Sequence, residues 1–369
     1  MEYLEKIKED VLGTQKAFKD LGLRQDTFCV MPFVNIILEP NGNVGLCRHK
    51  GIHNSSLGNL KQQTIKEIWE SDKAVQWRED FKSGSGEACE TELVDRRCNL
   101  CPELNKLLPH AEITNTKNPK ILRLTANLNG KCNLECQMCN VWKLPNGFYT
   151  EDNFWIPARE LFFKDILEVD MLSGEPFIQK DTYRLMDEVS SVNPDCQWTI
   201  TSNMHWVLSD FIKEKLNKIV VKNLIVSIDS LESVAYAKIR KLGNLDFVLS
   251  NLDKMLAYEK ERVASGRSKL NIRMHFLIQK DNWREVKNVI KYCREKEIIP
   301  FISYLYEPFE FSLGTLSYEE RVEILDFYLN TLNREELLLA QRIIKPLMRT
   351  LSKIDYTYYI TNFRDQTLQ

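Results

Sequence analysis

The sequence predicts an α/β protein: a parallel sheet built as an incomplete (β/α)6 barrel, with a small cysteine-rich region before it and a helical tail after it. Three observations predict this architecture. From about residue 119, short apolar runs alternate with longer stretches of helical periodicity, as in parallel-sheet proteins. All but two of the ten cysteines lie before residue 140. From Ser317 onward the pattern is helical.

Six strands are expected in the barrel, at residues 121–125, 168–172, 197–201, 223–227, 271–277 and 301–306. Between the last two, residues 281–297 read as an amphipathic helix with Val286, Val289 and Ile290 on its inward face. Because parallel strands bring their carboxyl ends to one edge of the sheet, the functional groups are expected at that edge.

A hairpin is predicted at the start of the cysteine-rich region. Residues 33–38 form a candidate strand, the turn signal Pro40-Asn41-Gly42-Asn43 follows, and residues 44–47 return. Such a hairpin brings the thiols of Cys29 and Cys47 together.

Two helices are predicted after the hairpin. Thr64 and Glu67 have the spacing of a capping box, and Trp77 lies on the apolar face of the second helix. The next two cysteines, Cys98 and Cys101, are separated by two residues. Cys89 also lies in this part of the chain.

Three more cysteines follow the first barrel strand. Cys132, Cys136 and Cys139 have the spacing C-x3-C-x2-C. Three thiolates can hold three irons of a cubane iron–sulfur cluster and leave the fourth iron able to bind a small molecule. A structural zinc site requires a fourth ligand close by, and the loop contains none.

This triplet resembles the cluster-binding loop of the radical S-adenosylmethionine (SAM) superfamily. Downstream, the segment Ser173-Gly174-Glu175-Pro176 resembles the Gly-Gly-Glu-Pro turn that binds the amino group of SAM in that family, with Ser173 replacing the first glycine. The resemblance implies that Glu175 lies near this ammonium group.

Further segments extend the resemblance to the ends of the third and fourth strands. Ser202 and Asn203, and then Ser227 and Asp229, stand where the family has contacts to the ribose and carboxylate of SAM. Arg240 lies in a segment that resembles one where a cation meets the SAM carboxylate.

The earlier cysteines resemble the auxiliary-cluster modules called SPASM and twitch domains. The resemblance implies that Cys29, Cys47, Cys98 and Cys101 hold an auxiliary [4Fe–4S] cluster, with Cys89 as a spare thiol or an alternative ligand. In the best-known members this module follows the barrel, whereas here it precedes the barrel. A structural zinc knuckle is the other interpretation of these four cysteines.

The resemblance implies a reaction. A [4Fe–4S] cluster on the triplet would bind SAM and cleave it reductively to a 5′-deoxyadenosyl radical, which abstracts hydrogen from a peptide or a small polar substrate. The auxiliary cluster would assist oxidation or cross-linking, and a reductase, flavodoxin or ferredoxin would donate electrons. The alternative is a non-catalytic redox sensor or metal-binding protein on a degenerate barrel, which the replacement at Ser173 favours.

Composition restricts the partners. The formal net charge of −2, with scattered Lys and Arg, does not favour a nucleic acid. The chain has no apolar run of membrane-spanning length and no signal-peptide pattern at its start, so a cytoplasmic protein is expected. In that compartment thiols stay reduced, which favours metal binding over disulfides.

Four parts are expected along the chain: a helix at 1–25, the auxiliary region at 26–117, the barrel at 118–315 and a helical extension at 316–369. The extension begins with a capping-box pattern at Ser317 and Glu320. It ends in a tyrosine cluster that includes Tyr358 and Tyr359, for which packing is preferred over a role in covering the substrate.

Overall fold

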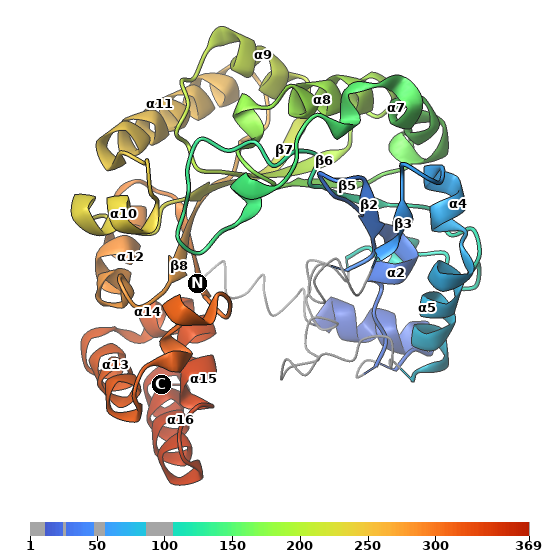
Figure 1. Cartoon of the computed structure of the whole chain (residues 1–369). Coiled ribbons are helices and arrows are strands. Elements are labelled where there is room, and N and C mark those ends of the chain that lie inside the picture. The colour runs from blue at the N-terminus through green and yellow to red at the C-terminus, as the bar shows by residue number, and fades with distance from the viewer. Residues whose placement is uncertain (1–11, 25–26, 48–55, 86–105, 369) are drawn as a thin grey trace.

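The computed structural model describes residues 12–24, 27–47, 56–85 and 106–368. Its centre is a nine-stranded sheet in the order β3-β2-β1-β4-β5-β6-β7-β8-β9, which curves through the molecule (Figure 1). The strands are β1 (Asn35–Leu38), β2 (Asn43–Gly45), β3 (Ser56–Asn59), β4 (Arg123–Ala126), β5 (Glu168–Met171), β6 (Gln197–Ser202), β7 (Val220–Ser227), β8 (Ile272–Ile278) and β9 (Ile299–Tyr304).

The strands β4 to β9 are the six predicted from the sequence, and their ends differ from the prediction by no more than three residues. They are adjacent in chain order and all parallel. The mixed α/β class with a parallel sheet is therefore confirmed. The loops that follow these strands all leave from the same edge of the sheet, as a parallel arrangement requires.

Helices cover the convex side of this sheet (Figure 1). They are α7 (Asp152–Ala158), α8 (Lys180–Val192), α9 (Asp210–Asn217), α10 (Ser233–Ile239), α11 (Leu245–Ala264) and α12 (Val286–Glu295). The predicted helix at 281–297 is shorter at both ends, because a 3₁₀ turn at Trp283–Glu285 precedes α12.

The two faces of the parallel sheet differ in polarity. In β8, the alternate residues Ile272, Met274, Phe276 and Ile278 are at most 4% exposed. The residues between them, including Arg273 and His275, are partly exposed. Alternation with a period of two gives one apolar face, buried under the helices, and one polar face. The polar face lines the concave side of the sheet.

The hairpin of β1 and β2 belongs to the same sheet as the barrel strands. Its antiparallel pairing confirms the predicted turn, with Gly42 at φ +84°. β1 also pairs in parallel with β4, from Asn35 opposite Arg123 to Leu38 opposite Ala126. The sheet is thus continuous between the predicted auxiliary region and the predicted barrel, whereas the division of the chain into four parts stays a prediction.

The first of the predicted hairpin strands starts later than expected, because residues Met31–Val34 form the short helix α2, with a proline in its first turn. Two helices follow the hairpin, α4 (Ile65–Trp69) and α5 (Asp72–Ser83). The capping box of Thr64 and Glu67 is confirmed, with both reciprocal hydrogen bonds present.

Four helices form the tail: α13 (Tyr318–Thr331), α14 (Arg334–Leu339), α15 (Gln341–Met348) and α16 (Lys353–Leu368). The predicted capping box at Ser317 and Glu320 is confirmed. Tyr359 is buried and donates to Asp326 at 2.7 Å, whereas Tyr358 is exposed. No helix within the described residues combines the length and the apolar character needed to cross a bilayer.

Candidate cluster and cofactor site

The cysteine triplet lies in the irregular loop after β4, and neighbouring segments fasten this loop through its backbone. Glu135 N donates to Lys241 O at 3.1 Å, and Gln137 N donates to Ile239 O at 2.9 Å. On another side, Glu175 N donates to Lys131 O at 3.0 Å. These bonds attach the loop to the segments after α10 and β5.

Each cysteine sulfur of the triplet accepts a hydrogen bond from nitrogen. Asn203 Nδ2 lies 3.7 Å from Cys132 Sγ, and Arg240 Nη1 lies 3.8 Å from Cys136 Sγ. The backbone N–H of Val141 donates to Cys139 Sγ at 3.5 Å. Such donors stabilise negative charge on sulfur, and hydrogen bonds to sulfur tune the potentials of iron–sulfur clusters.

Burial raises the pKa of the Cys132 thiol, and it raises the pKa of Cys136 to about 11 despite the nearby Arg240. Cys139, at the end of the triplet, is exposed. A metal must therefore displace protons from two partly buried thiols when it binds. Three thiols with N–H donors, in a loop without a fourth cysteine, fit a cluster that retains one iron without a cysteine ligand.

The turn after β5 approaches this loop closely at Gly174. Its φ is +59°, and a Cβ at this position would lie 2.3 Å from Lys131 O. Only glycine fits there without a shift of the backbone. The preceding position accommodates serine, because Ser173 Oγ donates to Asn129 O at 3.0 Å. The departure at Ser173 is thus compatible with the turn.

Glu175 is completely buried beside the loop, and its carboxylate accepts three hydrogen bonds. Asn203 N donates at 2.6 Å, Ser202 Oγ at 3.0 Å and Phe177 N at 3.2 Å. Burial outweighs these bonds and raises the pKa of Glu175 to about 7. Pro176, which follows, begins a 3₁₀ turn. The structure thus brings Glu175, Ser202 and Asn203 together.

Asp229 and Arg240 form a buried ion pair, with Arg240 Nη2 2.7 Å from Asp229 Oδ2. Leu277 N donates to Asp229 Oδ1 at 2.9 Å. Arg240 Nε has no hydrogen-bond partner among the described residues, although it is buried. The guanidinium thus joins Asp229 to Cys136, and its buried Nε–H remains for a further acceptor.

Ser227 ends β7, and its Cα is paired with that of His275 in β8. The site residues expected after the third and fourth strands therefore all lie at the carboxyl edge of the sheet.

The auxiliary cysteines are described only in part. Cys29 and Cys47 are partly exposed. Asn35 Nδ2 donates to Leu46 O at 3.1 Å, which ties the residue before Cys47 to β1. Cys89, Cys98 and Cys101 lie outside the described residues.

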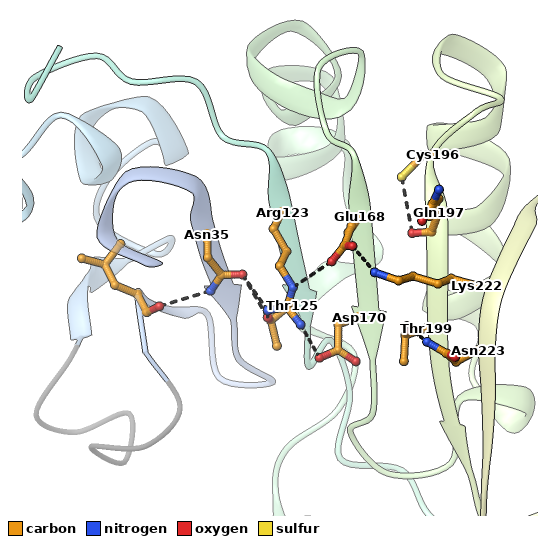
Figure 2. A network of polar contacts seen from close by, with 11 residues as sticks. Asn35, Arg123, Thr125, Glu168, Asp170, Cys196, Gln197, Thr199, Lys222 and Asn223 are labelled. Carbon is orange, nitrogen blue, oxygen red and sulfur yellow. Dashed lines mark hydrogen bonds and ion pairs between the residues drawn. The ribbon is translucent and has the colours of Figure 1, made fainter. Parts of the chain in front are cut away.

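A polar network on the concave face was not predicted from the sequence (Figure 2). Arg123 lies at its centre: Nη2 is 2.8 Å from Asp170, Nη1 is 3.1 Å from Asn35 Oδ1, and Nε is 3.5 Å from Glu168. Lys222 pairs with Glu168 from β7. One sequence pattern could have indicated this network: charged residues at every second position of a strand, such as Glu168 and Asp170, mark a polar face.

Comparisons with known proteins show what the chain is similar to. Residues 29–102 match the SPASM family model, described as an iron–sulfur cluster-binding domain. A probable GTP 3′,8-cyclase of Methanocaldococcus jannaschii is 23% identical over 190 residues, which are 50% of this chain and 60% of the relative.

Two further GTP 3′,8-cyclases are also similar to this chain. The GTP 3′,8-cyclase of Campylobacter jejuni is 25% identical over 216 residues, 56% of this chain and 63% of the relative. That of Clostridium botulinum is 27% identical over 146 residues, 37% of this chain and 44% of the relative. The chain spans less than two thirds of the length of each relative.

Among solved structures, the crystal structure of Streptococcus suis SuiB bound to S-adenosylmethionine matches with a TM-score of 0.42 and 15% identity. The match covers 70% of this chain and 57% of SuiB. The structure of polyhistidine-tagged anSMEcpe with bound AdoMet matches with a TM-score of 0.43 and 16% identity, covering 61% and 63% of the two chains.

The SPASM match over residues 29–102 and the similarity to these relatives support a radical SAM enzyme with a SPASM-type cluster-binding domain. The predicted resemblance is confirmed. Enzymes of this class bind a [4Fe–4S] cluster and SAM, and the SPASM domain indicates an auxiliary iron–sulfur cluster.

Proposed function

We propose that the chain reductively cleaves SAM to a 5′-deoxyadenosyl radical and uses it to abstract hydrogen from a peptide or a small polar substrate. The observation that carries this proposal is the convergence of polar groups on the triplet. Asn203 and Arg240 contact cysteine sulfurs and are themselves bonded to Glu175 and Asp229.

The bound cluster and SAM supply a radical able to take hydrogen from an unactivated carbon, which side-chain acids and bases cannot do. The residues of this chain hold and orient these groups. Cys132, Cys136 and Cys139 bind three irons in this proposal, and their N–H donors stabilise the thiolates.

In the proposed SAM site, one turn faces the amino group of SAM. This turn consists of Ser173, Gly174, Glu175 and Pro176. Ser202, Asn203 and Ser227 offer hydrogen bonds toward the ribose, and Asp229 and Arg240 face the carboxylate end. The buried and unpartnered Nε of Arg240 supports this last assignment, because a buried donor without an acceptor is costly.

We infer that strands β4 to β9 form an incomplete (β/α)6 barrel within residues 118–315, preceded by the auxiliary region at 26–117 and followed by the extension at 316–369. The parallel order of the six strands supports the barrel. In this arrangement the auxiliary region continues the sheet of the barrel through β1.

We assign Cys29, Cys47, Cys98 and Cys101 to the auxiliary cluster, which would assist oxidation or cross-linking of the substrate. The hydrogen bond from Asn35 to the carbonyl before Cys47 supports an auxiliary site attached to the barrel. A reductase, flavodoxin or ferredoxin is the proposed electron donor.

The test is anaerobic reconstitution with iron and sulfide, followed by dithionite and SAM, with 5′-deoxyadenosine measured by chromatography. The wild-type chain is expected to form 5′-deoxyadenosine, and Cys132→Ala is expected to form none. Cys196→Ala is the matched control, because Cys196 is a buried thiol that precedes β6 and lies outside the proposed site. A wild-type protein that holds its clusters without forming 5′-deoxyadenosine would refute the proposal in favour of a non-catalytic metal protein.

A further inference from the structure

We propose that the wall of the concave face formed by β8, β9 and α15 binds an anionic oxygen group of the substrate, a carboxylate or a phosphate, through Arg273 and Arg342. This inference rests on the proposed function, because it names the substrate class of that site.

Arg273 belongs to the concave face. It alternates in β8 with the buried residues Ile272 and Met274, and it lies two positions before His275 on the same side of the strand. Its Nε is buried without a hydrogen-bond partner among the described residues. No described carboxylate lies within ion-pair distance of Arg273, so its donors are available to an external acceptor.

Arg342 reaches the same wall from the tail. It lies in α15, which packs against β9. Its guanidinium carbon lies 5.2 Å from the centroid of the Phe301 ring. Phe301 in turn stacks on His275 with ring centroids 4.9 Å apart. Arg342 is exposed, and within the described part of the chain it forms no ion pair.

His275 and Ser303 add neutral polar atoms to the same wall. His275 Nε2 lies 2.5 Å from Ser303 Oγ. Burial lowers the pKa of His275 to about 4; Asp229 favours its protonation, whereas Arg240 and Arg342 oppose it. A neutral imidazole leaves the positive charge of this wall on the arginines and offers hydrogen bonds to the ligand.

Elsewhere on the concave face, the described cations are paired with carboxylates. On β4, Arg123 is paired with Asp170 and Glu168, and on β7, Lys222 is paired with Glu168. These cations are neutralised by carboxylates of the protein, whereas the arginines at β8 and α15 are not. Among the residues that the structure describes, the concave face is therefore charge-balanced at Arg123 and Lys222, and it carries unpaired positive charge at Arg273 and Arg342.

Guanidinium groups suit carboxylate and phosphate oxygens, because their planar N–H donors match two oxygens at once. Such a site lies on the concave face below the carboxyl edge, where Asp229 and Arg240 lie. An anionic end held there would leave the rest of the substrate to extend toward the proposed SAM site.

The test is isothermal titration calorimetry of the reconstituted full-length enzyme with inorganic phosphate and, separately, with succinate. We expect saturable binding of at least one probe, and we expect Arg273→Gln and Arg342→Gln each to weaken it about tenfold. Binding of phosphate alone identifies a phosphate-bearing substrate, binding of succinate alone a carboxylate, and binding of both a general oxyanion site. Absence of saturable binding of both probes would overturn the proposal.

Two further variants act as controls. Arg364→Gln removes the same charge from an exposed position of α16 and is expected to leave binding unchanged. Arg342→Lys keeps the charge but loses the planar fork, and it is expected to bind more weakly than wild type and better than Arg342→Gln. Equal binding by wild type and by the double variant Arg273→Gln/Arg342→Gln would also refute the site.

The same samples separate this inference from the proposed function. Formation of 5′-deoxyadenosine without anion binding refutes only the anion site. Anion binding that depends on both arginines, without formation of 5′-deoxyadenosine, refutes only the proposed radical chemistry.

Discussion

The guanidinium of Arg240 contacts the sulfur of Cys136, with Nη1 and Sγ 3.8 Å apart, while its other terminal nitrogen is ion-paired with Asp229. One buried side chain therefore connects the loop of the cysteine triplet to the end of β7. This contact joins residues 104 positions apart in the sequence.

The ion pair between Arg240 and Asp229 is expected to be essential for stability. Arg240→Gln leaves the carboxylate buried without its cation, which costs about 3–5 kcal/mol in comparable cases. Urea unfolding of the protein without its clusters measures this loss. The double variant Asp229→Asn/Arg240→Gln is expected to lose less than the sum of the single variants, and strict additivity would contradict a direct coupling.

Gly174 and Ser173 are expected to respond differently to substitution. Gly174→Ala places a Cβ against Lys131 O at a positive φ, so we expect lower stability and reduced incorporation of iron. Ser173→Gly removes only the hydrogen bond to Asn129 O, a loss of about 1 kcal/mol. Iron content and melting temperature test both variants. Equal loss in the two variants would contradict the close contact at Gly174.

The buried carboxyl of Glu175 is expected to make stability depend on pH. Its pKa is raised to about 7, so the folded protein binds more protons than the unfolded chain between pH 4.5 and 7. This contribution to stability is complete below pH 4.5 and is lost as the pH rises through 7. The shift of the pKa from 4.5 to about 7 corresponds to a contribution of about 3 kcal/mol to the free energy of unfolding. Urea unfolding at pH 5 and pH 7.5 measures it, and Glu175→Gln should remove this component.

The network at Arg123 is expected to hold the hairpin against the barrel. Arg123→Met removes the contacts to Asn35 and Asp170 and leaves two carboxylates with fewer partners. We expect a loss of about 2–3 kcal/mol. We also expect faster amide exchange in β1 relative to β6, measured by hydrogen–deuterium exchange. Uniform exchange across the sheet would argue against a local role for this residue.

The two groups of cysteines are expected to act separately. The variant Cys29→Ala/Cys98→Ala should lose about four irons per chain but should still cleave SAM in the presence of dithionite. The physical reason is that a cluster on the triplet would have its own cysteine ligands and its own N–H donors. Iron analysis and 5′-deoxyadenosine formation test this prediction, and complete loss of cleavage would contradict the division of the cysteines.

Much of the site could be predicted because it lies in short, continuous segments. The spacing of Cys132, Cys136 and Cys139 and the Ser173–Pro176 turn are local patterns, and strand alternation fixes which edge they occupy. The partners of these residues could not be predicted, because a contact such as that between Asn203 and Cys132 depends on how two distant loops meet.

By itself, the sequence predicted the class of this protein, its six parallel strands and the position of a candidate cluster loop, since periodicity and spacing are properties of neighbouring residues. Only the tertiary structure decided that β1 joins β4 in one sheet, that Arg240 joins Asp229 to Cys136, and that Arg273 and Arg342 share a wall on which no described carboxylate pairs with them. These features arise from packing between segments far apart in the chain, where side-chain burial and charge pairing are set by the fold.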